Sequence, residues 1–311
     1  IEAITTAFDG HHQKDGYAVL NNGFWGAGRF GCSGSDGGFG RQCALVYDAI
    51  REARTSAGDP VLSPEALQRV EQDLILSACA DSEHWDAVNN KCGPGRALSA
   101  AVGILFGRPE SVRRAIEGFD SLLEEGYHFD GFCTESPSYS NMHLNLLREL
   151  PEFLSGYSDP EGYTPESGDP IQDLRPFEQF PRYRLALLSM IRMLDPNLED
   201  PVIGDSRYGR RIQSIYAEVL AAHYGDQYAG LLEHAQDAPL GEKGSEYALW
   251  HRRPDLKVDG DMALPLRSEW FPGWQVAVMR GGTASSHTAF YHHAAPFGVH
   301  RHYDTLGLIY L

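Results

Sequence analysis

The chain has 311 residues, enough for a large hydrophobic core and more naturally two domains than one. Its composition, 42% hydrophobic and 22% charged residues, is typical of a globular protein, and no apolar run is long enough to cross a bilayer. A formal net charge of -17 repels nucleic acids and anionic membranes, and no Lys/Arg run offsets it. We therefore expect neither nucleic acid nor membrane among its partners.

The chain ends and the cysteines give weaker information. Ile1 is not an initiator methionine, and Leu311 closes a β-rich run, which indicates a processed or fragmentary chain. The five cysteines are an odd number without CxxC spacing, so they predict neither a zinc ribbon nor a full disulfide framework. Cys32 and Cys43 could pair across a Gly-rich segment, which leaves the redox compartment open.

The first part of the chain is expected to be helical. Residues 23–40, GFWGAGRFGCSGSDGGFG, are too glycine-rich for a helix or strand and predict a long loop. Helical periodicity then recurs in the segments 41–54, 63–80, 109–126, 182–194 and 210–225. In the second of these, Ser63 is placed to cap the helix and Pro64 suits its first turn.

The last part of the chain is expected to be β-structure. From Ala248 the sequence changes to short β-favouring pieces, GWQVAVMRGG, SSHTAFYHHA and LGLIYL, separated by Gly, Pro and Ser. We predict an all-helical domain over residues 1–245 and the start of an antiparallel β domain over 246–311. Segregated helices and strands favour a site in the cleft between them.

Two polar clusters in the helical part could carry chemistry. In HWDAVNNK, Asn89 and Asn90 lie between two helical segments and could donate hydrogen bonds to a carboxylate, although a helix cap or turn explains them as well. In DGFCTESPSYSNMH, Asp130-Gly131 predicts a turn and Tyr139 follows Pro137 among polar residues. Tyr139 could act as an acid or base if its pKa were shifted, but a packed aromatic is the commoner role.

A third cluster, PFGVHRHYD, lies close to the C-terminus. If it forms a strand, His300, His302 and Asp304 share one face while Arg301 and Tyr303 point the other way. Two imidazoles and a carboxylate on one face could bind a metal or transfer a proton, while packing inside a core is the alternative without function.

Several segments in order resemble the heparinase II/III-like polysaccharide lyases, which include alginate, oligoalginate, heparin and heparan lyases. These segments are ALVYDAI, WDAVNNKCGPGRALSAAVGILFG, DGFCTESPSYSNMH, PVIGDSRYG, GWQVAVMRGG and PFGVHRHYDTLGLIYL, and they cover roughly residues 40–311. The resemblance implies an α+β multidomain fold, an (α/α) toroid followed by an antiparallel β-sandwich truncated in this chain. It also implies β-elimination at a 4-linked uronic acid.

The resemblance also implies roles for particular residues. Asn90, with Asn89, would neutralise the uronate carboxylate, Tyr139 would be the acid, and His300 the base or a carboxylate partner. His302 and Asp304 would hold a structural zinc, and the chemistry itself would need no cofactor. Further substrate contacts would come from Asn89, Lys91, Glu135, Arg301, Tyr303 and His143.

Two features depart from the family pattern. Many relatives carry a catalytic His directly after the Asn, whereas here Lys91 follows Asn90, so His84, His143 or Tyr139 itself could replace that base. The acidic net charge would repel a polyuronate, so arginines near the cleft must offset it. The candidates are Arg29, Arg96, Arg207, Arg210, Arg280 and Arg301.

Two other functions are compatible with the sequence. One is a glycoside hydrolase on a helical toroid that uses a carboxylate pair such as Asp130 and Glu135. The other is a carbohydrate-binding member without activity, in which Asn90-Lys91 marks a lost site. We expect a secreted or periplasmic protein whose partner is an acidic polysaccharide or oligosaccharide and which could form a homodimer.

Overall fold

The computed structural model describes residues 1–15, 29, 33–84, 87–207, 209, 211–258, 267–283, 286–294, 300 and 307–310. Internal packing divides the chain into two compact units. Unit 1 contains Ile1–Leu122 and Leu146–Gln179, and unit 2 contains Leu123–Asn145 and Phe180–Leu311. Each unit is therefore built from two separate stretches of the chain.

Unit 1 is helical. Two helices have residues in both units, namely α6 (Pro109–Gly126) and α7 (Pro137–Leu147). The other helices of unit 1 are α1 (Glu2–Asp15), α2 (Ser33–Ile50), α3 (Pro64–Arg69), the π-helix η1 (Val70–Leu76), α4 (Ser77–Glu83), α5 (Gly93–Leu105), α8 (Glu149–Leu154) and α9 (Pro176–Gln179). Its core includes Phe8, Tyr47, Val70, Leu74 and Leu98.

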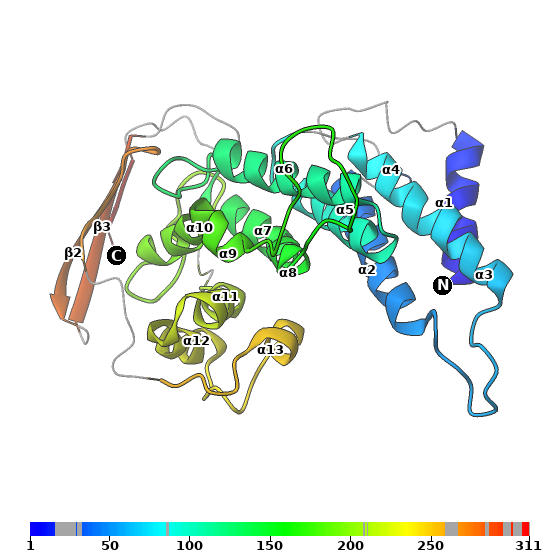
Figure 1. Cartoon of the computed structure of the whole chain (residues 1–311). Coiled ribbons are helices and arrows are strands. Elements are labelled where there is room, and N and C mark those ends of the chain that lie inside the picture. Colours follow the sequence, from blue (N-terminus) through cyan, green and yellow to red (C-terminus); the bar gives the residue numbers. More distant parts are fainter. Residues whose placement is uncertain are drawn as a thin grey trace. The chain divides into compact units, whose positions relative to one another are not determined.

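After the cap at Ser63, the consecutive elements α3, η1 and α4 form one continuous helical segment that ends at Glu83 (Figure 1). Ser63 caps it as predicted, because its hydroxyl oxygen accepts a hydrogen bond from the amide of Ala66 at 3.1 Å. Pro64 occupies the first turn, where the missing amide proton is not needed. Val70 and Leu74 are fully buried, in agreement with the helical periodicity predicted for residues 63–80.

The prediction of a loop through residues 23–40 is wrong for its last eight residues. Helix α2 begins at Ser33 and runs through the glycines. A Cβ on Gly34 would collide with the carbonyl oxygen of Lys91, and one on Gly37 would lie 2.8 Å from Gly95 Cα. The glycines thus let α2 pack closely against α5, and this contact outweighs their low helix propensity. Residues 16–28 and 30–32 lie outside the described part.

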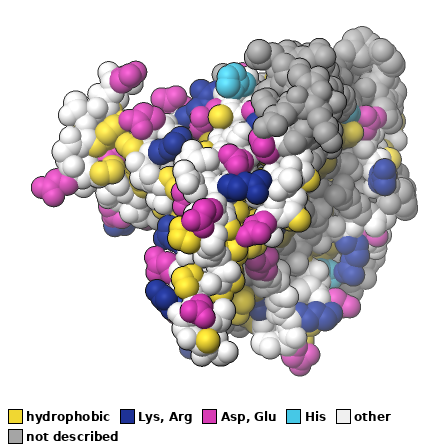
Figure 2. All heavy atoms as spheres, turned by 90° about the vertical axis from the view of Figure 1, so that its right-hand side faces the viewer, with side chains coloured by type: hydrophobic (Ala, Val, Ile, Leu, Met, Phe, Trp, Pro, Cys, Tyr) yellow, Lys and Arg dark blue, Asp and Glu magenta, His cyan; other side chains and the backbone are white. Residues whose placement is uncertain are grey.

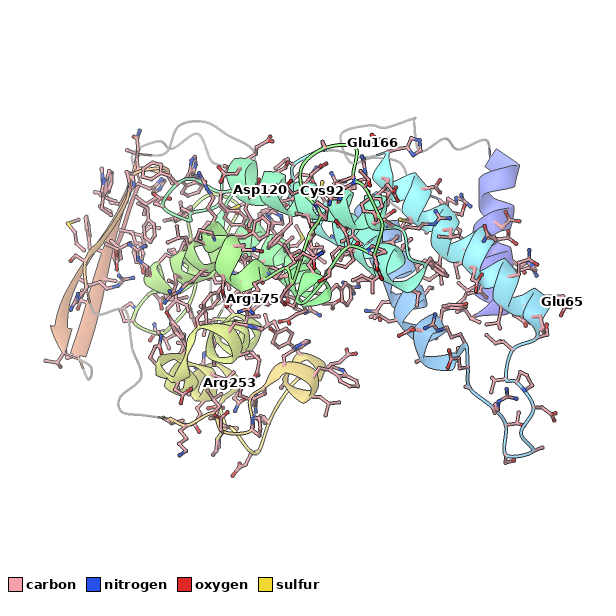
Figure 3. All side chains as sticks on the ribbon, viewed as in Figure 1. Glu65, Cys92, Asp120, Glu166, Arg175 and Arg253 are labelled. Atoms are coloured by element: carbon pink, nitrogen blue, oxygen red, sulfur yellow. The ribbon has the colours of Figure 1, made fainter. Side chains whose placement is uncertain are left out.

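A loop between α8 and α9, residues 155–175, carries Glu166, which is labelled in Figure 3. A buried ion pair fixes this loop in unit 1. The Asp159 carboxylate, 1% exposed, pairs with Arg113 on α6 and accepts hydrogen bonds from the Ile171 amide at 2.8 Å and the Tyr157 hydroxyl at 3.0 Å. Burial alone would raise the pKa of Asp159, but these donors outweigh burial and lower it.

Unit 2 combines helices with a sheet. Its helices are α10 (Pro181–Arg192), α11 (Ser214–Tyr224), the 3-10 helix η2 (Asp226–Tyr228), α12 (Ala229–Gln236) and α13 (Glu246–His251). Its strands are β1 (Glu269–Phe271), β2 (Val276–Thr283), β3 (Ser286–His293) and β4 (Gly307–Tyr310), paired antiparallel in the order β1-β2-β3-β4.

The sheet packs against other residues of the same unit through buried aromatic side chains. Trp274 and Phe271 are fully buried, and Phe132 stacks on Trp274 with ring centroids 4.8 Å apart. The hydroxyl of Tyr291 on β3 donates to the Met193 carbonyl at 2.8 Å. These contacts fix the sheet near the end of α10.

The predicted β-structure is confirmed for three strands and corrected at its start. Residues 246–251 form helix α13, and the first strand begins at Glu269. The toroid, the sandwich and the domain boundary at residue 245 stay predictions. None of the helices in the described ranges is long and apolar enough to span a membrane.

Cys43 is a free thiol buried in the core of unit 1, and Cys32, its suggested partner, lies outside the described residues. Burial raises the pKa of Cys43 to about 11, so this thiol is unreactive at neutral pH. On the molecular face in Figure 2, acidic and basic side chains are interspersed. The acidic residues on that face therefore do not form a single continuous patch.

Candidate active site

The segment ESPSYS places Tyr139 in the first turn of α7. Pro137 begins the helix, and the carbonyl of the preceding Ser136 accepts a hydrogen bond from the Ser140 amide at 2.8 Å. A proline in the first turn needs no hydrogen-bond acceptor and has a φ suited to a helix. Tyr139 is half-buried, whereas its neighbours Ser138 and Ser140 are buried.

Tyr139 lies against His300. The two rings are parallel within 11° and their centroids are 3.5 Å apart. His300 is in a turn with a φ of 59°, so the prediction that it lies on a strand is wrong. The strand of this region, β4, begins at Gly307, and Arg301, His302, Tyr303 and Asp304 lie outside the described residues.

Carboxylates flank both nitrogens of the His300 ring. Nδ1 lies 3.0 Å from Asp205 Oδ2, and Nε2 lies 3.9 Å from Glu135 Oε2. The main chain adds a further contact, because the Asp205 amide donates to the His300 carbonyl at 3.0 Å. The side chains of His300 and Glu135 are 16% and 11% exposed and that of Asp205 is 45% exposed, so this group is open to solvent mainly at Asp205.

Residues 200–207 join this group to helix α7. The Ser138 amide donates to Ser206 Oγ at 3.2 Å, and the Arg207 amide donates to Ser138 Oγ at 3.3 Å. Deeper in unit 2, the side-chain amide of Asn141 donates to the Asp200 carboxylate, and both residues are buried. Sequence reasoning assigned no role to Asp205 or Ser206, although they lie in the segment PVIGDSRYG that it singled out.

His143, one turn after Tyr139, is in the interior. It is 2% exposed, and its ring stacks on Tyr127 with centroids 5.3 Å apart. Burial lowers the pKa of His143 to about 4, so its imidazole is neutral at neutral pH. In this position it offers no surface to a substrate. His84 lies at the exposed end of α4 in unit 1.

The asparagines are in unit 1, between α4 and α5 as predicted (Cys92, the residue before α5, is labelled in Figure 3). Asn89 Oδ1 accepts a hydrogen bond from the Lys91 amide at 2.9 Å, which forms a turn. Asn90 is 3% exposed, and Lys91 is half-buried. The turn explains Asn89 without a ligand, and the proposed contact of Asn90 with a carboxylate stays a prediction.

Asp130 has a structural role. Its carboxylate accepts from the Phe132 amide at 3.1 Å and from the Gly273 amide at 2.8 Å, while Gly131 completes the predicted turn with a φ of 85°. These two amide hydrogen bonds engage both carboxylate oxygens of Asp130 and hold the loop, so its side chain is already used in a structural role. The structure therefore gives the Asp130–Glu135 hydrolase no support.

The arginines and the metal ligands can be placed only in part. Arg29 and Arg96 are buried in unit 1, Arg280 binds the carbonyls of Arg192 and Leu194 in unit 2, and Arg207 is exposed. Arg210 lies outside the described residues. Within the described ranges, no group of three His, Cys, Asp or Glu side chains could hold a metal.

No protein-family model matches the chain, and no curated protein matches it by sequence. Comparison with solved structures gives a clear result. The chain resembles heparinase III in fold. The match to a heparinase III structure with methylated lysines has a TM-score of 0.55 at 12% identity and covers 90% of this chain and 38% of that one. A heparan sulfate lyase HepC mutant from Pedobacter heparinus matches with a TM-score of 0.46 at 13% identity, over 89% of this chain and 44% of that one.

The heparinase III match concerns the fold alone, because the sequence identity is low. It agrees with the segments that resemble heparinase II/III-like lyases, which were found independently of the fold. The chain spans less than half the length of either matched structure.

Proposed function

We propose that this chain is part of a polysaccharide lyase that cleaves a 4-linked uronic-acid polysaccharide by β-elimination. The observation that carries the proposal is the stacked Tyr139–His300 pair, with carboxylates at both imidazole nitrogens. Such a pair supplies an acid and a base side by side, which elimination needs when the proton and the leaving oxygen are on the same side of the sugar ring. The fold shared with heparinase III supports the same class of reaction.

The reaction assigns a step to each group. His300 takes the C5 proton, the C5–H electron pair forms the C4–C5 double bond, and the C4–O bond breaks. Tyr139 then gives its hydroxyl proton to the leaving oxygen. The tyrosinate regains a proton that originates from His300, so no water or redox partner is consumed. Each proton transfer contributes about 10²–10⁴-fold to the rate.

Charge on the uronate must be neutralised while the C5 proton leaves. We assign this role to Asn90, with Asn89 beside it, because amide donors can stabilise the developing enolate without titrating. The exposed Arg207, whose amide bonds to Ser138 on α7, offers a cation for an acidic polymer. The zinc proposed at His302 and Asp304 would be structural and takes no part in these steps.

Ultraviolet absorbance tests the proposal, because β-elimination creates an unsaturated uronate that absorbs and hydrolysis does not. The full-length protein is incubated with a panel of heparan sulfate, heparin, hyaluronan, chondroitin sulfate and alginate. We expect absorbance to rise with at least one polymer and Tyr139→Phe to abolish the rise while the fold is kept. A matched control is Tyr228→Phe, a half-buried tyrosine on η2 of the same unit.

Two outcomes would contradict the proposal. New reducing ends without absorbance would indicate a hydrolase, and polymer binding without any product would indicate a carbohydrate-binding protein. Full activity in Tyr139→Phe would remove Tyr139 from the mechanism.

A further inference from the structure

We infer that Asp205 is a positioning residue that keeps a proton on Nδ1 of His300 and so makes Nε2 the nitrogen that accepts the substrate proton. This inference rests on the proposed function for its catalytic consequence, although the position of the proton can be measured without substrate. In a neutral imidazole one nitrogen donates and the other accepts, and the hydrogen bond at one nitrogen decides which is which.

The two ring nitrogens of His300 have different surroundings. Asp205 lies at hydrogen-bond distance from Nδ1, 3.0 Å, whereas Glu135 lies 3.9 Å from Nε2, beyond that distance. An ionised carboxylate only accepts, so Nδ1 must carry the hydrogen. Nε2 then keeps its lone pair, and after it takes a proton Glu135 faces the new positive charge.

Asp205 holds both the side chain and the main chain of His300. Its carboxylate contacts Nδ1, and its amide donates to the His300 carbonyl at 3.0 Å. His300 has a φ of 59°, a conformation that is unfavourable for a residue with a side chain and persists only when contacts hold it. Tyr139 covers one face of the ring and limits its rotation.

Asp205 is itself held in place by its neighbours in the chain. The next residue, Ser206, accepts from the Ser138 amide, and Arg207 donates to the Ser138 hydroxyl, so this segment is fixed to the first turn of α7. The buried hydrogen bond from Asn141 to Asp200 fixes the start of the same segment. The helix that carries Tyr139 therefore also carries the segment that orients His300.

The experiment compares Asp205→Asn with Asp237→Asn. Asp237 is an exposed aspartate of unit 2 at a left-handed position, where asparagine is equally suited. We expect Asp205→Asn to lower kcat about 10²–10⁴-fold with KM within about threefold, as for loss of an orienting carboxylate behind a catalytic histidine. The control variant should keep wild-type kcat. A kcat for Asp205→Asn within about threefold of wild type overturns the inference.

NMR of ¹⁵N-histidine-labelled protein reads the position of the proton directly. The chain has 13 histidines, and the ring-nitrogen signals that disappear in His300→Gln are those of His300. At a pH of about 8, where an ordinary imidazole is neutral, we expect the Nδ1–H form in the wild type and a shift toward the Nε2–H form in Asp205→Asn. The Nε2–H form in the wild type overturns the inference.

The two proposals fail in different ways. If no polymer is cleaved, the proposed function fails and the wild-type NMR signal still decides the position of the proton. If Asp205→Asn does not fold, as judged by circular dichroism, the wild-type signal decides the question without the variant. Activity together with an Nε2–H histidine would keep the lyase and refute the role of Asp205.

Discussion

The buried imidazole of His143 should make unit 2 sensitive to mild acid. The ring is 2% exposed and stacked on Tyr127, and burial lowers its pKa to about 4 from an ordinary value near 6.5. The native state therefore holds the neutral form while the unfolded chain takes up a proton. The stabilisation from this difference is fully present above pH 6.5 and is lost as the pH falls from 6.5 toward 4.

The size of the effect follows from the separation of the two pKa values. Between pH 6.5 and pH 5 the unfolded histidine is mostly protonated and the folded one is not. Each pH unit in that interval lowers the free energy of unfolding by about 1.4 kcal/mol, so the loss between pH 7 and pH 5 is about 2 kcal/mol. Other titrating groups also make the free energy of unfolding depend on pH. Their contribution cancels when the wild type is compared with a variant that lacks only the His143 imidazole.

The variant is His143→Phe, which keeps an aromatic ring beside Tyr127 but cannot take up a proton. Urea unfolding at pH 7 and pH 5 gives the loss of stability for each protein. We expect the wild type to lose about 2 kcal/mol more than His143→Phe. His84→Gln, at the exposed end of α4, is the control and should behave like the wild type. An equal loss in wild type and His143→Phe would refute the reasoning.

Three further substitutions test the packing that supports the site and the fold. Asp159→Ala leaves the Arg113 charge without its buried partner, and urea unfolding should show a loss of about 3 kcal/mol. Gly131→Ala places a Cβ against the Leu185 carbonyl at a φ of 85°, so we expect at least about 2 kcal/mol of destabilisation or no folded protein. Tyr291→Phe removes the buried hydrogen bond to the Met193 carbonyl and the hydrogen bond between this hydroxyl and Arg280, and the free energy of unfolding should fall by at least about 1 kcal/mol; an unchanged value would show that these bonds add nothing.

Local sequence signals predicted several elements well. The segment 109–126 was expected to form an amphipathic helix, and α6 has those bounds. The cap at Ser63 and the turn at Asp130-Gly131 were also confirmed. In these cases the deciding interactions join residues a few positions apart, so periodicity, a cap or a turn residue is enough.

The secondary-structure predictions were wrong where contacts between residues far apart in the sequence decide the conformation. The glycines at the start of α2 predict a loop by propensity, but they form a helix because their bare backbone packs against α5. His300 follows a β-favouring pattern, yet it adopts a turn held by Asp205, 95 positions earlier in the chain.

The sequence by itself therefore determined the helices with a regular apolar periodicity, the three strands β2, β3 and β4, and that Tyr139 and His300 could carry chemistry. Only the tertiary structure decided that these two rings stack and that Asp205 and Glu135 flank the imidazole. The physical reason is the separation along the chain over which each kind of interaction acts. Side-chain periodicity and capping act over a few residues, whereas the ionisable neighbours of a group depend on how segments far apart in the chain pack together.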